Sequence, residues 1–166
     1  MPELPEVETM VRGIADAAQG RVIAALRRAR CRCRPMDIRP RFATIARKVQ
    51  GRGIERVFRR AKRVVFELAH TECRTRANEN SLHYLVIEPR MTGLMLLADP
   101  PDVEYLRLEW RLSHGRRQSS LWYWDRRGLG TLRLYNSRQF DDSLGPRTLG
   151  PDALEFTADV WRERLG

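Results

Sequence analysis

Hydrophobic residues repeat with a helical period in two segments near the start of the chain. In the first, Val7, Val11 and Ile14 recur at spacings of three and four residues, which predicts a helix over Pro5–Ala18. A proline and acidic side chains in its first turn suit the N-terminal end of a helix. The same spacing predicts a second helix over residues 39–50. Each helix would bury one apolar face and expose the other.

Elsewhere the hydrophobic period is two, which is the spacing of half-buried strands. One such segment, early in the chain, alternates arginine with alanine and cysteine. The other predicted strands follow the second helix and are separated by turns. The predicted strands cover residues 28–34, 54–58, 64–68, 82–87, 93–97, 106–112, 119–124 and 131–135, with a polar loop over 70–81. Many short strands with frequent turns predict an α+β fold, an antiparallel β-sandwich flanked by an N-terminal helix and a second helix.

The composition changes after the last predicted strand. Residues 1–135 are predicted to form one domain that contains the β-sandwich. Glycine, proline, serine and aspartate are frequent over residues 136–156, which predicts a linker. A short amphipathic helix capped by a threonine is predicted over residues 157–166. We interpret it as the first helix of a second domain that is cut short.

Positive charge is the first indication of function. The chain of 166 residues has 31 Lys and Arg against 21 Asp and Glu, a net charge of +10. Fifteen basic residues and only two acidic ones lie between Arg27 and Arg63. Such a clustered excess indicates a polyanionic partner, nucleic acid rather than a membrane surface. Solvated surface charge is the alternative explanation of the same composition.

Three cysteines and an acidic N-terminal segment bear on the compartment. The odd number of cysteines indicates a reduced, cytoplasmic protein rather than a disulfide framework. No secretory leader is predicted, because Glu3, Glu6 and Glu8 stand where a leader would be basic and then apolar. No membrane-spanning segment is predicted either, because the sequence has no long apolar run. A zinc site built from the cysteines is not expected, since no histidine lies at ligand spacing.

The first residues could carry covalent chemistry. Removal of Met1 would leave Pro2 as a secondary amine at the chain terminus, and an α-amine titrates near pH 8, so part of it is nucleophilic. Attack on an aldehyde or hemiacetal carbon would give an iminium ion, which draws electrons for β-elimination. Glu3 beside it could act as acid or base. Acidic residues that merely cap a helix would explain the same segment.

Four segments together resemble a known family. The opening Met1–Thr9, Met-Pro-Glu-Leu-Pro-Glu-Val-Glu-Thr, resembles that of formamidopyrimidine-DNA glycosylases. Arg59-Arg60-Ala61-Lys62 with the strand after it, Arg90-Met91-Thr92-Gly93, and residues 149–154 resemble three further family segments in order and spacing. The resemblance covers essentially the whole chain but about half of a full-length enzyme. Such enzymes continue with a helix–two-turn–helix domain and usually a zinc finger.

The resemblance implies roles for individual residues. Pro2 would be the nucleophile on deoxyribose C1′, Glu3 the general acid at the sugar ring oxygen, and Glu6 would hold the site together. Lys62 would contact phosphate or the damaged nucleotide, and Met91 would fill the gap left by the everted base. A core methionine is the alternative for that last residue.

Further DNA contacts are implied beside these. They would come from Arg59, Arg60, Arg127 and Leu129. Arg127 falls where the family has the arginine that faces the orphaned cytosine. The chain departs from the family at neighbouring positions. Gly128 replaces a phosphate-contacting arginine, Leu129 replaces a wedging phenylalanine, and Glu88-Pro89 stands where the family often has His-Leu. These changes bear on the preference for the opposite base.

The function implied is excision of oxidised purines, such as 8-oxoguanine and formamidopyrimidines, from double-stranded DNA, followed by β,δ-elimination at the abasic site. No metal or other cofactor is expected in this chain, zinc belonging to the later part of full-length relatives, and a monomer is expected. One alternative is an endonuclease VIII-like glycosylase for oxidised pyrimidines, against which Leu4 argues, because those proteins usually have glycine there. The other alternative is a DNA-binding fragment without chemistry.

Overall fold

The computed structural model describes residues 3–70, 82–150, 152–154, 157 and 162. Nine strands form one continuous ladder in the order β2-β9-β5-β4-β3-β1-β7-β8-β6. The strands are β1 Val22–Arg28, β2 Asp37–Arg39, β3 Arg52–Arg60, β4 Arg63–His70, β5 His83–Glu88, β6 Gly93–Leu96, β7 Leu106–His114, β8 Arg117–Asp125 and β9 Thr131–Asn136. All neighbouring pairs are antiparallel except β2 with β9, which is parallel.

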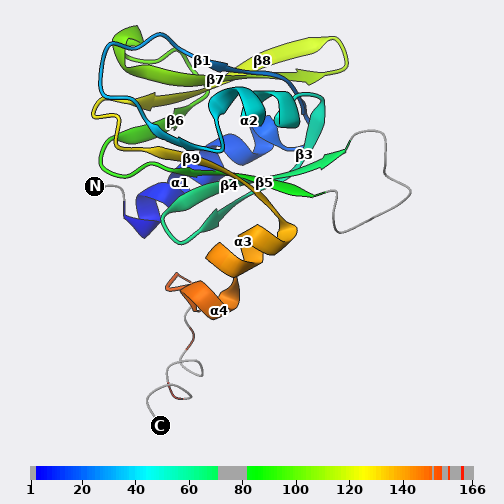
Figure 1. Ribbon diagram of the computed structural model, residues 1–166, viewed down its shortest axis with the longest axis vertical. Coiled ribbons are helices and arrows are strands. Elements are labelled where there is room, and N and C mark those ends of the chain that lie inside the picture. Colours follow the sequence, from blue (N-terminus) through cyan, green and yellow to red (C-terminus); the bar gives the residue numbers. More distant parts are fainter. Residues whose placement is uncertain (1–2, 71–81, 151, 155–156, 158–161, 163–166) are drawn as a thin grey trace.

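The sheet folds over itself to make two layers (Figure 1). Strands β3 and β1 are joined by a single residue pair, Val22 with Gly53, so the ladder turns sharply there. One layer holds β2, β9, β5, β4 and β3, and the other holds β1, β7, β8 and β6. Phe66 of the first layer stacks on Trp110 of the second, with ring centroids 5.8 Å apart. The predicted sandwich is therefore confirmed.

Two helices close the sandwich. Helix α1 spans Leu4–Ala18, as predicted to within one residue, and buries Val7, Val11 and Ile14. It packs against β3 and β4 of one layer and β6 of the other. Helix α2 spans Phe42–Val49 and contacts β1 and β2. It is shorter than predicted, because residues 37–39 pair with β9 as a strand instead.

The strand predicted over residues 28–34 is wrong. Strand β1 runs from Val22 to Arg28 and buries Ile23 and Leu26 against the core. It pairs with β7 as far as Arg28 with Leu108, close to the residue where β7 begins. Beyond that point no partner strand is available, so the alternating arginine and cysteine residues form an irregular loop. We call residues 29–36 the arginine loop.

The expected linker contains two further helices. Helix α3, Ser137–Leu144, begins with a capping box formed by Asn136 and Gln139. Its apolar residues Phe140 and Leu144 pack against Val65 and Val86 on the outer face of the sheet. Helix α4 spans residues 146–149 and follows directly (Figure 1). A polar composition concealed α3, because only one narrow stripe of it is apolar.

Two other predicted segments lie largely outside the residues that the structure describes. The predicted loop over residues 70–81 falls outside the described residues, apart from its first one, which ends β4. The helix predicted over 157–166 lies outside them too, except for residues 157 and 162. Within the described part of the chain, none of the helices has the length and apolar character needed to cross a membrane.

Candidate functional site

The predicted functional residues gather where several strands begin or end. Residues 61–62 form the turn between β3 and β4, and Met91 lies between β5 and β6. Val64 pairs with Ile87, Glu88 with Thr131, and Gly93 with Asp125, so these turns and the segment 126–130 all lie at one edge of the sandwich. We call this the loop edge.

Glu3 and Lys62 meet at the start of α1. The Glu3 backbone N–H donates to the Glu6 carboxylate over 2.9 Å, and the Glu3 carboxylate accepts from the Glu6 backbone N–H. This capping box fixes both acids beside the first turn. The Lys62 ammonium forms an ion pair with the Glu3 carboxylate, and the side chains remain 40% and 52% exposed. The structure thus brings Glu3, Glu6 and Lys62 together, while Pro2 lies outside the described residues.

The turn that carries Lys62 is a tight one. Arg60 pairs with Arg63 across it, and Ala61 adopts a φ of 49°. A left-handed conformation is uncommon for a residue with a Cβ atom and costs some free energy. The ion pair with Glu3 shows that the Lys62 side chain extends from this compact turn back toward the start of α1.

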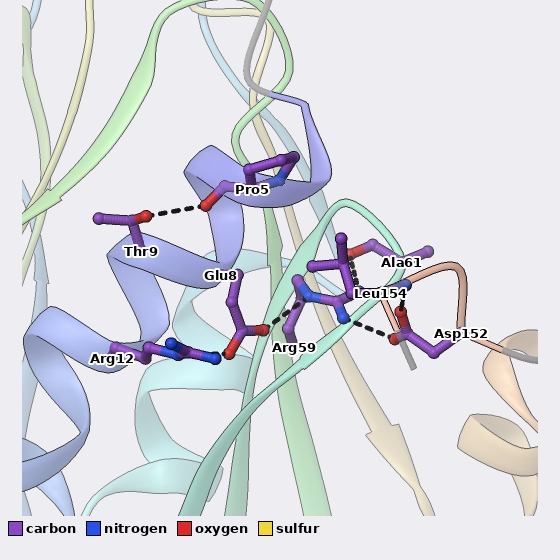
Figure 2. A network of polar contacts seen from close by, with 8 residues as sticks. All are labelled: Pro5, Glu8, Thr9, Arg12, Arg59, Ala61, Asp152 and Leu154. Atoms are coloured by element: carbon purple, nitrogen blue, oxygen red, sulfur yellow. Dashed lines mark hydrogen bonds and ion pairs between the residues drawn. The ribbon is translucent and has the colours of Figure 1, made fainter. Parts of the chain in front are cut away.

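Arg59 lies in a buried network rather than on the surface (Figure 2). Its side chain is only 4% exposed and donates to the Glu8 carboxylate over 2.8 Å and to the Asp152 carboxylate over 2.7 Å. A weaker contact of 3.3 Å reaches the Ala61 carbonyl. The network joins α1, the β3–β4 turn and the segment after α4. The guanidinium is therefore engaged by two carboxylates in this structure.

The network shifts the pKa of each member. The hydrogen bond from Arg59 lowers the pKa of Glu8 and likewise that of Asp152, although burial opposes both shifts. Burial by itself would lower the pKa of Arg59, but its hydrogen bonds to Asp152 and Glu8 outweigh this and raise it. All three groups are thus held in their charged forms near neutral pH.

Arg60 is also engaged by the protein. Its Nε donates to the Leu144 carbonyl at the end of α3 over 2.7 Å. Its Nη2 is buried without a hydrogen-bond partner among the described residues. The side chain ties α3 to the β3–β4 turn. Arg59 and Arg60, both predicted to contact DNA, thus hold neighbouring segments in place in this structure.

Met91 is exposed at the tip of a tight turn. It is 38% exposed, and the turn closes through a 3.0 Å hydrogen bond from the Gly93 N–H to the Pro89 carbonyl. A Cβ atom on Gly93 would lie 2.3 Å from the Tyr123 hydroxyl, so only glycine fits there. Arg90 pairs with Glu88 over 3.1 Å. The exposed position favours the wedge interpretation over a core methionine.

Asp125 holds the two loops of this edge together. Its fully buried carboxylate accepts hydrogen bonds from the Thr92 hydroxyl over 2.6 Å, the Arg127 N–H over 3.1 Å and the Gly130 N–H over 2.8 Å. Arg127 is exposed and Leu129 is half-buried in the segment so fixed. Sequence reasoning did not identify Asp125, although an acidic residue directly after a strand of aromatic residues was a possible signal.

The arginine loop is connected to the same edge through Arg107. This nearly buried side chain donates from Nη1 to the Arg34 carbonyl over 2.9 Å and from Nε to the Asp125 carbonyl over 2.7 Å. Gly128 has a φ of 62°, and a Cβ atom there would lie 2.2 Å from the Arg34 carbonyl oxygen. The arginine expected at position 128 from the family pattern could therefore not be accommodated in this packing.

Unpaired positive charge is concentrated near the arginine loop. Five side chains there are exposed and form no ion pair with any residue in the described ranges: Arg27, Arg28, Arg30, Arg32 and Arg34. A cavity of about 630 Å³ lies among them, lined in part by Arg107. Exposed arginines without acidic neighbours offer a site for phosphate groups.

Comparison with known proteins agrees with this arrangement. The model of the formamidopyrimidine-DNA glycosylase N-terminal domain matches residues 1–132. The chain is 33% identical to the formamidopyrimidine-DNA glycosylase of Chloroflexus aurantiacus over 170 residues, which cover 99% of this chain and 54% of that protein. The chain therefore spans about half the length of the curated relatives that it matches.

Solved structures share its fold. A structure of MutM in complex with DNA containing carbocyclic 8-oxo-G superposes with a TM-score of 0.73 at 26% identity, covering 99% of this chain and 56% of that one. The Lactococcus lactis formamidopyrimidine DNA glycosylase, non-covalently bound to DNA containing an AP site, gives a TM-score of 0.72 at 25% identity, covering 99% and 57%.

Proposed function

Because the chain belongs to the formamidopyrimidine-DNA glycosylase family, we propose that it forms the N-terminal catalytic part of a base-excision repair enzyme that removes oxidised purines from double-stranded DNA. One observation carries the proposal furthest: Glu3, Glu6 and Lys62 meet at the start of α1, at the same edge as the exposed Met91. This edge of the fold thus offers two acids, a cation and an apolar wedge.

The chemistry begins at the Pro2 amine, which processing of Met1 would free. The amine nitrogen attacks C1′ of the damaged nucleotide, and the glycosidic bond breaks with its electron pair leaving on the base. Glu3 accepts the proton that the amine nitrogen loses and delivers it to the sugar ring oxygen as the C1′–O4′ bond opens, which leaves an iminium ion between the proline nitrogen and C1′. Loss of a C2′ proton then expels the 3′ phosphate, and a second elimination expels the 5′ phosphate.

The cation and the wedge serve binding. Lys62, held by Glu3, can exchange that partner for a phosphate next to the lesion, because both side chains are partly exposed. Met91 enters the base stack and offsets the cost of everting the damaged base. Arg127 and Leu129 approach the opposite strand from the segment fixed by Asp125.

Borohydride trapping tests the covalent step. The chain with Met1 removed, confirmed by intact mass, is incubated with duplex DNA that contains an abasic site and then reduced. We expect a stable adduct, and none from a variant that carries one extra residue before Pro2, because the amine is then an amide nitrogen. Undiminished trapping by that blocked variant would assign the chemistry to another amine, with Lys62 as the next candidate.

Substrate choice is tested with matched duplexes. Cleavage is compared for 8-oxoguanine opposite cytosine, for an oxidised pyrimidine, and for undamaged DNA. We expect cleavage of the first, and Met91→Ala should slow it more than it slows cleavage of a preformed abasic site, since no base is left to evert. Preference for the oxidised pyrimidine would support an endonuclease VIII-like activity, and binding without cleavage would support a DNA-binding role alone.

A further inference from the structure

Cys31 and Cys33 form a thiol pair inside the cationic cavity of the arginine loop. Both are free and half-buried, and both line the cavity of about 630 Å³ together with Arg28, Arg30 and Arg32. Neither takes part in the proposed glycosylase chemistry. A single residue separates them, and the segment has no regular secondary structure, so the backbone can adapt to bring the sulfur atoms together.

The Cys31 sulfur already contacts the residue that would become its partner. The Cys33 backbone N–H donates to the Cys31 Sγ over 3.4 Å, so this sulfur lies over the backbone of its neighbour. Hydrogen bonding with the Cys31 side chain, followed by burial, raises the pKa of Cys33, which therefore keeps its proton at neutral pH. Because a single residue separates the two cysteines and both side chains line the same cavity, a local change of torsion angles brings the sulfur atoms to bonding distance.

We propose that Cys31 and Cys33 are a reversible oxidation site for hydroperoxides, and that its disulfide form displaces the loop that carries Arg127 and Leu129. The Cys31 sulfur attacks the peroxide, an S–O bond forms as the O–O bond breaks, and water or an alcohol leaves. The Cys33 sulfur then attacks the resulting sulfenic acid, the S–S bond forms, and a second water leaves. Two thiols thereby supply the two electrons that reduce one peroxide.

The path from the sulfurs to the loop edge is short. Arg34 follows Cys33 directly, and its carbonyl oxygen accepts from Arg107 over 2.9 Å. Arg107 also holds the Asp125 carbonyl, and Gly128 packs against the same Arg34 carbonyl. A disulfide across a single intervening residue must rearrange this backbone, and a strained disulfide is easily reduced again. The first part of the proposal is independent of the proposed function, and the second part rests on it.

Mass spectrometry tests the oxidation site without any DNA. The chain with Cys73→Ser retains only these two thiols. With hydrogen peroxide we expect a monomer lighter by about 2 Da that no longer reacts with iodoacetamide and regains both thiols with dithiothreitol. Cys33→Ser should instead yield a sulfenic acid that dimedone captures at Cys31. Retention of both thiols under peroxide that oxidises glutathione would overturn the proposal, as would exclusive formation of sulfonic acids or of linked dimers.

DNA binding tests the coupling. Affinity for a duplex with an abasic site is divided by affinity for undamaged duplex, before and after oxidation. We expect this ratio to fall about tenfold in the oxidised chain, since the loss of one positioned base contact changes discrimination by about this factor. The Cys31→Ser/Cys33→Ser chain should keep its ratio in peroxide. A disulfide that leaves the ratio unchanged would refute the coupling alone, and a chain with no preference in either state would count against the proposed function.

Discussion

Arginines in two regions of this molecule have different roles. Arg59 and Arg60, on β3, are engaged by carboxylates and a carbonyl and join helices to the sandwich. Arg30 and Arg32, in the arginine loop, are exposed and form no ion pair with the described residues. The same side chain is thus structural where acids surround it and available to a ligand where they do not. Net charge alone could not separate the two groups.

Removal of Arg59 should have the largest effect on stability. Arg59→Ala would leave the Glu8 and Asp152 carboxylates without their buried partner, so we expect a loss of about 3–5 kcal/mol in the free energy of unfolding. Arg12→Ala is the matched control, because Arg12 pairs with the same Glu8 but is 79% exposed and should contribute under about 1 kcal/mol. Urea denaturation measures both, and equal losses would contradict the distinction.

Asp125 is a second buried acidic residue, and its removal should rank next. Asp125→Ala deprives the Thr92 hydroxyl and two backbone N–H groups of their acceptor, with an expected cost of about 2–3 kcal/mol. Thr92→Val removes one of these hydrogen bonds and should cost about 1 kcal/mol. If loop position matters for catalysis, Asp125→Ala should also slow excision in conditions where it remains folded. An unchanged rate there would assign Asp125 to stability only.

Acid should weaken the ion pairs that Arg59 forms with Glu8 and Asp152. The pKa values of Glu8 and Asp152 are lowered in the folded protein, so their stabilisation is present above the ordinary carboxyl pKa, near 4, and is lost as the pH falls through the lowered values. The difference in unfolding free energy between the natural chain and Arg59→Ala should therefore shrink between about pH 5 and pH 3. A constant difference over this range would mean that the ion pairs contribute little.

Substitutions in the arginine loop should have the smallest effect on stability, but they should change the salt dependence of DNA binding. Arg30→Ala and Arg32→Ala should change the unfolding free energy by less than about 0.5 kcal/mol. Each should reduce the slope of log affinity for duplex DNA against log salt by about 0.9 if it neutralises one phosphate. Arg116→Ala, in the exposed β7–β8 turn at the far end of those strands, is the control and should leave the slope unchanged.

Local pattern determined much of this protein. The spacing of Val7, Val11 and Ile14 defined α1, which buries one apolar face. Short hydrophobic segments between turns defined β3, β4 and β5 as strands. Strands β4 and β5 bury both faces, because α3 covers Val65 and Val86 on the outer face of the sheet. The short N-terminal motif with Glu3 and Glu6 was likewise visible, since a capping box is local in the chain.

Long-range partners decided the rest. The alternation of arginine and cysteine resembled a strand, but β7 begins too late along the sheet to pair with it. The burial of Arg59 in an ion-pair network depended on Glu8 and Asp152, which lie far from it in sequence in opposite directions. Asp125 became a loop-holding residue only because β6 and β9 start beside it. A strand needs a partner and a buried charge needs a counter-charge, and the chain supplies both only once it is folded.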